Sequence, residues 1–217
     1  MSLQIYMYQK HPSEKLNHLF SEKSFQGVSP EKSKFLFVGL DANYAENIES
    51  QSIFDKIIEY HFDGVSFWQR YQVHHPFLLD EYKGDGRKYH KNFARIGFQN
   101  KDANTVSFIE LLHLPSVGRN KLSVSDLSTS HLTKINDWII NSPVKYIFIS
   151  SGVANLMHKS KKFSWLPTKP EETYRNLKIF WQNKNKIVFS YLHFSNYGKF
   201  EEQMRLESQT IKELAES

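Results

Sequence analysis

Two polar stretches that directly follow apolar runs contain the side chains best suited to chemistry. Asp41 lies two residues beyond the apolar run 35–39, and His193 comes directly after the apolar run 187–192. A carboxylate and an imidazole can act as base and acid, or can stabilise the opposite charges that develop as a bond breaks. The placement of these two residues therefore makes Asp41 and His193 the leading catalytic candidates.

Each of the two residues also has a structural interpretation. An Asp after a strand commonly stabilises a turn or caps the next helix. A single His at the end of a strand is commonly structural as well. The catalytic interpretation of Asp41 and His193 therefore depends on their pairing, which requires that the two strand ends meet at one edge of a sheet.

Four apolar runs predict the strands of such a sheet, and helical periodicity fills most of the chain between them. The predicted strands are 35–39, 105–112, 144–150 and 187–192, and the predicted helices are 11–25, 52–62, 64–70 and onward, 129–140, 155–159, 173–181 and 199–216. This β-then-α pattern predicts an α/β fold, a three-layer α/β/α sandwich with a central four-stranded, mainly parallel sheet. The interval of about 65 residues between the first two strands predicts inserted helices that line the site.

Parallel strands place their carboxyl ends at one edge of the sheet, where ligands of such folds bind. Polar side chains follow each predicted strand: Asp41 after the first, Glu110 at the second, Ser151 after the third and His193 after the fourth. The turn at Gly152, between a strand and a helix, would also offer backbone N–H groups to an anion. We therefore expect these residues to converge on one crevice.

Composition narrows the classes of protein that remain. The chain has 217 residues, a net charge of +5, a pI near 9.1, 15% aromatic residues and no cysteine. This length suits a single domain over 1–217, and the mild positive charge is compatible with a polyanionic partner such as DNA. The lack of cysteine excludes disulfides and cysteine-bound zinc or iron–sulfur clusters.

The sequence contains neither a recognisable targeting segment nor a metal-binding motif. We find no N-terminal leader and no apolar run of membrane-spanning length, so we expect a soluble cytoplasmic monomer that does not bind membranes. Adjacent His74 and His75 cannot both face one ligand from a single helix, and no other ligand spacing is evident. We therefore expect no metal and no cofactor.

The segment 80–99 alternates basic and aromatic side chains. Lys88 and Lys91 stand among basic residues there, interspersed with Tyr82, Tyr89 and Phe93. Such alternation suits a nucleic-acid groove, which combines phosphate contacts with base stacking. An ordinary solvated helix face is the alternative, and both interpretations remain open at this point.

Three short motifs together resemble a known family. Gly39-Leu40-Asp41-Ala42-Asn43-Tyr44 resembles the first motif of the uracil-DNA glycosylase superfamily, Gly-x-Asp-Pro-Tyr or Gly-x-Asn-Pro-Gly, and His193-Phe194-Ser195 resembles its second motif, His-Pro-Ser. The run 148–154 is similar to the strand–Gly–x–Ala turn between them. The sequence departs from the family at Ala42 and Phe194, where the motifs have Pro, and at Glu110, the position nearest to the base-reading Asn.

The resemblance implies hydrolysis of a base–sugar N-glycosidic bond in DNA. The target base would leave the stack and enter a pocket. Asp41 would stabilise the sugar cation or orient a water molecule, and His193 would stabilise the departing base. The other positions implied in substrate binding are Gly39, Leu40, Asn43, Tyr44, Phe54, Glu110, Ser151, Gly152, Ser195, Asn196 and Tyr197.

Several of these roles have specific physical reasons. Tyr44, Phe54 or Phe67 would stack on the base, while Ser195 and the Ser151–Gly152 turn would hold phosphates. Tyr197 or Phe200 would fill the gap that the base leaves in the duplex. Core packing is the alternative for Phe54, Phe67, Tyr197 and Phe200.

Glu110 decides which base the site would prefer. An ionised carboxylate accepts hydrogen bonds but does not donate them, so it would favour a base with an exocyclic amine. The alternative is a structural Glu paired with Arg119 or Lys121. Three functions remain open: a glycosylase for a deaminated or damaged base, a non-catalytic nucleic-acid-binding protein of the same fold, and an N-glycosidase acting on free nucleosides.

Overall fold

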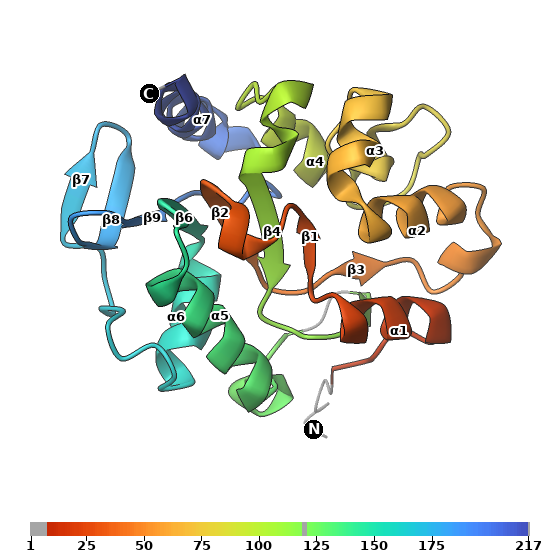
Figure 1. Ribbon diagram of the computed structural model, residues 1–217, viewed down its shortest axis with the longest axis horizontal. Coiled ribbons are helices and arrows are strands. Elements are labelled where there is room, and N and C mark those ends of the chain that lie inside the picture. The colour runs from red at the N-terminus through yellow and green to blue at the C-terminus, as the bar shows by residue number, and fades with distance from the viewer. Residues whose placement is uncertain (1–7, 119–120, 217) are drawn as a thin grey trace.

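A seven-stranded sheet runs through the centre of the molecule in the computed structural model, which describes residues 8–118 and 121–216 (Figure 1). The strand order is β1-β4-β2-β6-β9-β8-β7. A second, two-stranded parallel sheet pairs β3 with β5. The strands are β1 (Phe25–Gly27), β2 (Phe35–Gly39), β3 (Asn43–Tyr44), β4 (Val106–Glu110), β5 (Ser116–Val117), β6 (Tyr146–Ile149), β7 (Glu172–Tyr174), β8 (Leu177–Gln182) and β9 (Ile187–Ser190).

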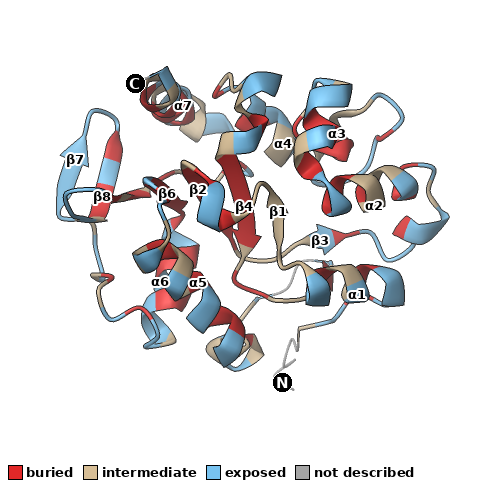
Figure 2. Cartoon of the chain, in the orientation of Figure 1, coloured by how far each residue is buried: buried red, intermediate tan, exposed pale blue. Residues whose placement is uncertain are grey.

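The four predicted strands are the parallel centre of the large sheet. β4, β2, β6 and β9 are neighbours and run parallel, whereas β1, β8 and β7 are antiparallel additions at the two edges. The predicted count of four strands was therefore too low. β1 has only three residues and β7 is exposed along its length (Figure 2), so neither has the apolar run by which a buried strand is recognised.

Helices cover both faces of this sheet. Alternate residues of β2 point to opposite faces, so Leu36 and Val38 pack with α5 and α6, while Phe35 and Phe37 pack in an aromatic core under α3, α4 and α7 (Figure 1). The helices are α1 (Glu14–Glu22), α2 (Phe54–Phe62), α3 (Gly64–Tyr71), α4 (Arg87–Ala94), α5 (Thr129–Asn141), α6 (Ser151–Lys159) and α7 (Glu201–Glu216). The fold is therefore mixed α/β with a mostly parallel central sheet.

Three helices are inserted between the first two predicted strands, and one of them shares a third core beside the sheet with α1. α2, α3 and α4 occupy this interval, as the long spacing predicted. α1 and α2 bury a separate apolar cluster that includes Leu16 and Ile57. α1 is shorter than the predicted helix 11–25, because Ser13 caps its first turn and Phe25 already belongs to β1.

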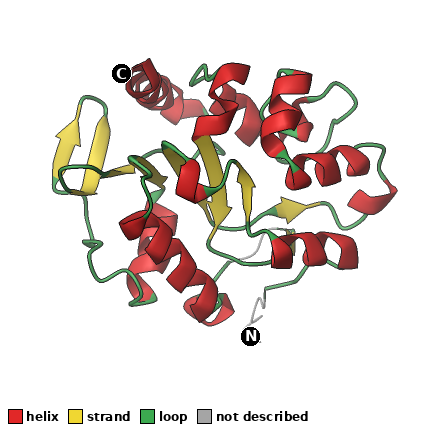
Figure 3. Cartoon of the chain, in the orientation of Figure 1, coloured by secondary structure: helices red, strands yellow, loops and turns green. Residues whose placement is uncertain are grey.

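The predicted helix 173–181 is wrong. This segment is the antiparallel hairpin of β7 and β8, which projects from one side of the molecule (Figure 3). Leu177 and Ile179 are buried on either side of exposed Lys178, which is the two-residue period of a strand. Arg175, at the turn, has a φ of 53°, a left-handed conformation that a helix interior does not allow.

No helix among the described residues is both long and apolar enough to cross a bilayer.

Candidate active site at the carboxyl edge of the sheet

Asp41 and His193 lie at equivalent depths beyond one edge of the sheet. Val38, Ile149 and Ser190 form one row across the parallel strands β2, β6 and β9. Asp41 is three residues beyond Val38, and His193 is three residues beyond Ser190. Because β6 alone separates β2 from β9, the two strand axes are about 10 Å apart. The pairing inferred from the sequence thus has both residues at the same edge.

The two-stranded sheet of β3 and β5 fixes the position of Asp41. Asn43 of β3 pairs with Ser116 of β5, and the Ser116 hydroxyl donates a hydrogen bond to Asp41 Oδ2. The Asn43 amide donates to Ser116 Oγ at 3.2 Å and also to the Gly118 carbonyl. Asn43 therefore holds this turn together, and Ser116, which is fully buried, is a site residue that sequence reasoning missed.

Glu110 packs directly against Gly39. The two residues are opposite each other in the β2–β4 register, and a Cβ atom added to Gly39 would lie 2.0 Å from Glu110 Oε2. Burial, and secondarily the negative charge of Asp41, raise the pKa of Glu110 well above its ordinary value. The environment therefore favours the protonated carboxylic acid over the carboxylate.

The predicted ion pair of Glu110 has no support in the described chain. No salt bridge joins Glu110 to Lys121 among the described residues, and Arg119 lies outside them. Its backbone carbonyl instead accepts a hydrogen bond from His131 Nε2 at 2.8 Å, which ties the end of β4 to α5.

The His193 imidazole is held as a hydrogen-bond donor. The backbone N–H of Ser195 donates to His193 Nδ1 at 3.3 Å, and the Ser195 hydroxyl lies 2.7 Å from the same nitrogen. Because Nδ1 accepts from a backbone N–H, the proton of the neutral ring is on Nε2. Burial lowers the pKa of His193, which keeps the ring neutral.

The loop that carries His193 is anchored from two sides. The Asn92 amide of α4 donates to the Phe194 carbonyl at 2.6 Å, and the Asn196 amide donates to the His193 carbonyl at 2.8 Å. The Phe194 ring is almost completely buried in the aromatic core. Asn196 thus acts within the loop, and Asn92 is a second positioning residue that sequence reasoning missed.

Two tyrosines lie near both His193 and Glu110. The Tyr89 ring is 5.1 Å from the His193 ring. Burial, and to a smaller extent the charge of Glu110, raises the pKa of both Tyr89 and Tyr191, whose hydroxyl groups share a hydrogen bond. Sequence reasoning did not assign Tyr191 to the site. Its signal in the sequence was a hydroxyl near the end of the predicted strand 187–192, two residues before His193.

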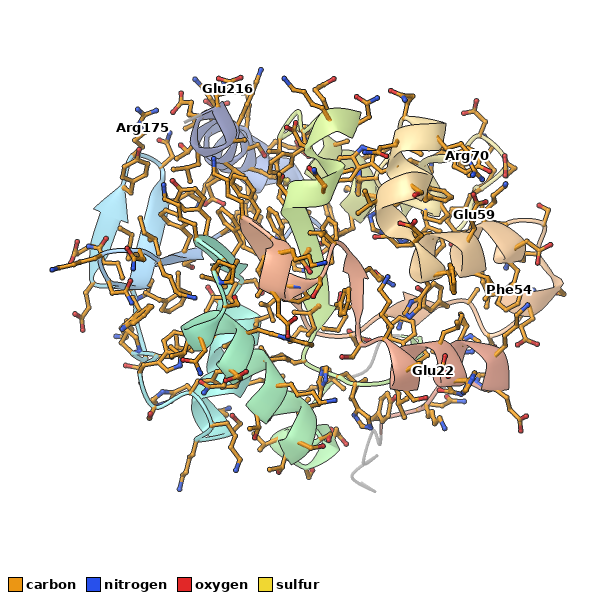
Figure 4. All side chains as sticks on the ribbon, viewed as in Figure 1. Glu22, Phe54, Glu59, Arg70, Arg175 and Glu216 are labelled. Atoms are coloured by element: carbon orange, nitrogen blue, oxygen red, sulfur yellow. The ribbon has the colours of Figure 1, made fainter. Side chains whose placement is uncertain are left out.

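The aromatic residues proposed to stack on a base are packed in the protein. Tyr44, Phe54 and Phe67 are all buried, and Phe54 lies on α2, away from the centre of the sheet (Figure 4). The core-packing alternative describes these three rings. Tyr197 differs, because it is 67% exposed and Lys88 Nζ lies 3.8 Å from its ring centroid.

A hollow lies beside this edge of the sheet, at the start of α6. It has a volume of about 480 Å³, and Leu40 and Gly152 line it together with Lys121 and Lys159. Ser151 and Gly152 are exposed, whereas the Ser150 side chain already caps the helix by accepting from the Val153 N–H. The hollow thus combines two lysines with free space at a helix N-terminus.

The basic and aromatic segment 80–99 divides between surface and core. Tyr82 and Phe93 are buried, so these rings are not available to stack on bases. Lys88 and Lys91 are exposed on α4. Tyr89 is partly buried beside His193, so the surface of this segment is mainly basic.

The described residues contain no cluster of three or more His, Asp or Glu side chains with the geometry of a metal site. His75 and His90 instead stack their rings at 3.6 Å, and His74 Nε2 lies 3.2 Å from His90 Nδ1. Burial lowers the pKa of all three histidines. These residues form a packed neutral cluster.

Comparison with protein-family models, with curated proteins and with solved structures finds no significant match to this chain.

Proposed function

We propose that the protein is a DNA glycosylase that hydrolyses the N-glycosidic bond of a deaminated or damaged base such as uracil. The observation that carries the proposal is the placement of Asp41 and His193 at equivalent positions beyond one sheet edge, with His193 held as an Nε2–H donor. The resemblance of the two motifs supports the same assignment. The proposal also implies a monomer that acts inside the cell on DNA.

The two residues suit the two charges of this reaction. As the bond between the base and the sugar breaks, its electron pair leaves with the base and positive charge develops on the sugar. The Asp41 carboxylate, oriented by the Ser116 hydroxyl, would stabilise that cation or orient the water molecule whose oxygen bonds to the sugar carbon. The His193 Nε2–H would donate to the carbonyl oxygen on which negative charge develops.

The surroundings offer contacts for a DNA strand. Lys121 and Lys159 line the hollow beside Gly152, where they would contact phosphates. The exposed Tyr197 ring, with Lys88 against it, would stack at the gap left by the flipped base. We take the four parallel strands and the helices on their two faces as the α/β/α core that the resemblance implies, with β1, β7 and β8 as additions.

The test is a strand-cleavage assay on oligonucleotides with uracil, hypoxanthine, xanthine or mismatched thymine. We expect abasic product from at least one substrate, and a decrease of roughly 100-fold or more in Asp41→Asn and His193→Ala. Matched controls are Asp55→Asn and His158→Ala, which replace an exposed carboxylate on α2 and an exposed imidazole on α6.

The alternatives give different results in the same assay. Binding of oligonucleotides without product on any substrate would indicate the non-catalytic nucleic-acid-binding protein. Release of base from free nucleosides without affinity for DNA would indicate a nucleoside N-glycosidase. Full activity in both Asp41→Asn and His193→Ala would refute the proposed mechanism.

A further inference from the structure

Glu207 of α7 has a buried carboxyl group that the proposed mechanism does not use. Only 5% of the residue is exposed, and no ion pair of Glu207 is present within the described chain. Two uncharged donors bind its oxygens: the Leu192 N–H lies 2.6 Å from Oε2, and the Gln203 amide donates to Oε1 at 2.7 Å. An apolar side chain would pack here without the cost of burying a charge, so the carboxyl group indicates that an acceptor is needed at this place.

The central sheet provides no strand partner for the Leu192 N–H. Tyr191 still continues the parallel ladder, since its N–H donates to the Ile149 carbonyl at the end of β6 at 3.2 Å. The N–H of the next residue points to the opposite side of β9, toward β8. Continuing the β8–β9 register by two residues places position 192 opposite position 176, which lies in the hairpin turn before β8 begins. Glu207 therefore supplies an acceptor where the sheet has ended.

The Leu192 N–H belongs to the backbone that leads directly into His193. On one side of His193, Leu192 is bonded to α7 through Glu207. On the other side, the Phe194 carbonyl is bonded to the Asn92 amide of α4 at 2.6 Å. Because the imidazole itself is bonded to Ser195 of the same loop, its position relative to the sheet depends on these two backbone anchors.

The helix α7 is itself fixed to the rest of the molecule. Met204 and Ile211 are buried in the aromatic core on this face of the sheet. The Asn176 amide donates to Thr210 Oγ1 at 3.1 Å, which joins α7 to the hairpin of β7 and β8. Glu207, about one turn before Thr210, joins the same helix to the His193 loop. The two buried polar side chains of α7 thus anchor different parts of the molecule.

We propose that Glu207 is a positioning residue for His193: its carboxyl oxygen accepts the Leu192 N–H beyond the end of the sheet and so fixes where the His193 imidazole meets the departing base. The inference rests on the proposed function and adds a residue that acts through the backbone of the loop. Without the acceptor, the Leu192 N–H is left unpaired and its peptide group turns toward another partner. A displacement of about 1 Å at a catalytic group can lower a rate by about 100-fold.

The experiment compares wild type with Glu207→Gln, Glu207→Met and Thr210→Ala. Glu207→Gln keeps a carbonyl oxygen as the acceptor, whereas Glu207→Met fills a similar volume without one. Thr210→Ala is the matched control on α7. In single-turnover cleavage of an oligonucleotide, we expect Glu207→Met to lower the maximal rate by about 10-fold to 100-fold, with little change in the DNA concentration that gives half of that rate. Glu207→Gln should restore most of the rate, and Thr210→Ala should keep the wild-type rate even if urea unfolds it earlier.

The second measurement needs no substrate. Nitrogen-15 labelling of the histidine rings, with His193→Ala to identify the His193 signals, shows which ring nitrogen carries the proton. Wild type, Glu207→Gln and Thr210→Ala should have the proton on Nε2, whereas Glu207→Met should show a mixture of the two tautomers because the loop is no longer held. Gln203→Ala, which leaves Glu207 in place but frees its Oε1, should give a smaller change in the same direction and serves if Glu207→Met does not fold.

Two results would overturn the positioning role. One is a Glu207→Met protein with the wild-type rate and wild-type ring signals, whatever its stability. The other is a Glu207→Gln protein that is as impaired as Glu207→Met, because the acceptor oxygen would then not be the cause. If no oligonucleotide yields product while the ring signals of His193 change as described, the glycosylase proposal fails and the positioning of His193 by Glu207 stands.

Discussion

The contact between Gly39 and Glu110 predicts a specific coupling in stability. Gly39 does not have a positive φ, so Ala is compatible with the backbone and the only obstacle is space. The added Cβ would lie 2.0 Å from Glu110 Oε2 and 2.6 Å from its Cδ. The Glu110 side chain must therefore move away, and we expect Gly39→Ala to lower the free energy of unfolding by about 1 kcal/mol, the lower end of the range for overpacking, because a carboxyl group can rotate.

The same substitution should behave differently once the carboxyl group is removed. In a Glu110→Ala background, Gly39→Ala loses its clash and keeps only the reduced entropy of the unfolded chain, which stabilises proteins by about 0.4–1 kcal/mol. The coupling energy of the double-mutant cycle should thus be about 1–2 kcal/mol. Urea denaturation of the four proteins, with equal m-values, measures it.

Gly152→Ala is the control for the double-mutant cycle. Gly152→Ala places its Cβ no closer than 3.8 Å to any neighbour, so its effect should be the same with and without Glu110. Additivity of Gly39→Ala and Glu110→Ala within about 0.5 kcal/mol would refute the contact.

Three further predictions concern the loop, the histidine and the acid stability. Asn92→Ala removes the anchor of the Phe194 carbonyl and should lower the free energy of unfolding by about 1–3 kcal/mol in urea, with reduced turnover. Ser195→Ala keeps the backbone donor to His193 but loses the hydroxyl, so single-turnover rates should fall by roughly tenfold at most without change in stability. Burial lowers the pKa of His61 to about 4, so the unfolded chain binds the extra proton below the ordinary histidine pKa and stability falls with pH. His61→Gln should abolish up to about 3 kcal/mol of that loss in urea titrations between pH 7 and 4.

The parallel centre of the fold could be predicted because its signal is local. Each of β2, β4, β6 and β9 is an apolar run that is buried on both faces, and such runs are recognisable in sequence. β8 was misread as a helix because its apolar residues include an adjacent pair, Ile179 and Phe180, next to a register shift in the pairing with β9. A strand with such an irregularity loses the strict alternation by which it is identified.

The site could be predicted only where it follows from strand ends. Asp41 and His193 were placed by that rule alone. Ser116 reaches Asp41 across 75 positions in sequence, and Asn92 reaches Phe194 across 102. No local pattern encodes such contacts, since they depend on the packing of α4 and the β3–β5 pair against the sheet edge. Likewise, the protonation of Glu110 depends on burial by elements distant in sequence.

These distant contacts also restrain the two turns at the positions where the resembled motifs have proline. A proline stiffens a turn by fixing φ. At Ala42, the backbone carbonyl instead accepts the Ser116 N–H at 2.9 Å, so the small β-sheet restrains the turn after Asp41. At Phe194, a buried ring and the Asn92 amide restrain the loop after His193. Both catalytic candidates are therefore held by tertiary contacts in place of proline rings, and disrupting the Asn92 anchor should affect turnover more than an exposed substitution such as His158→Ala.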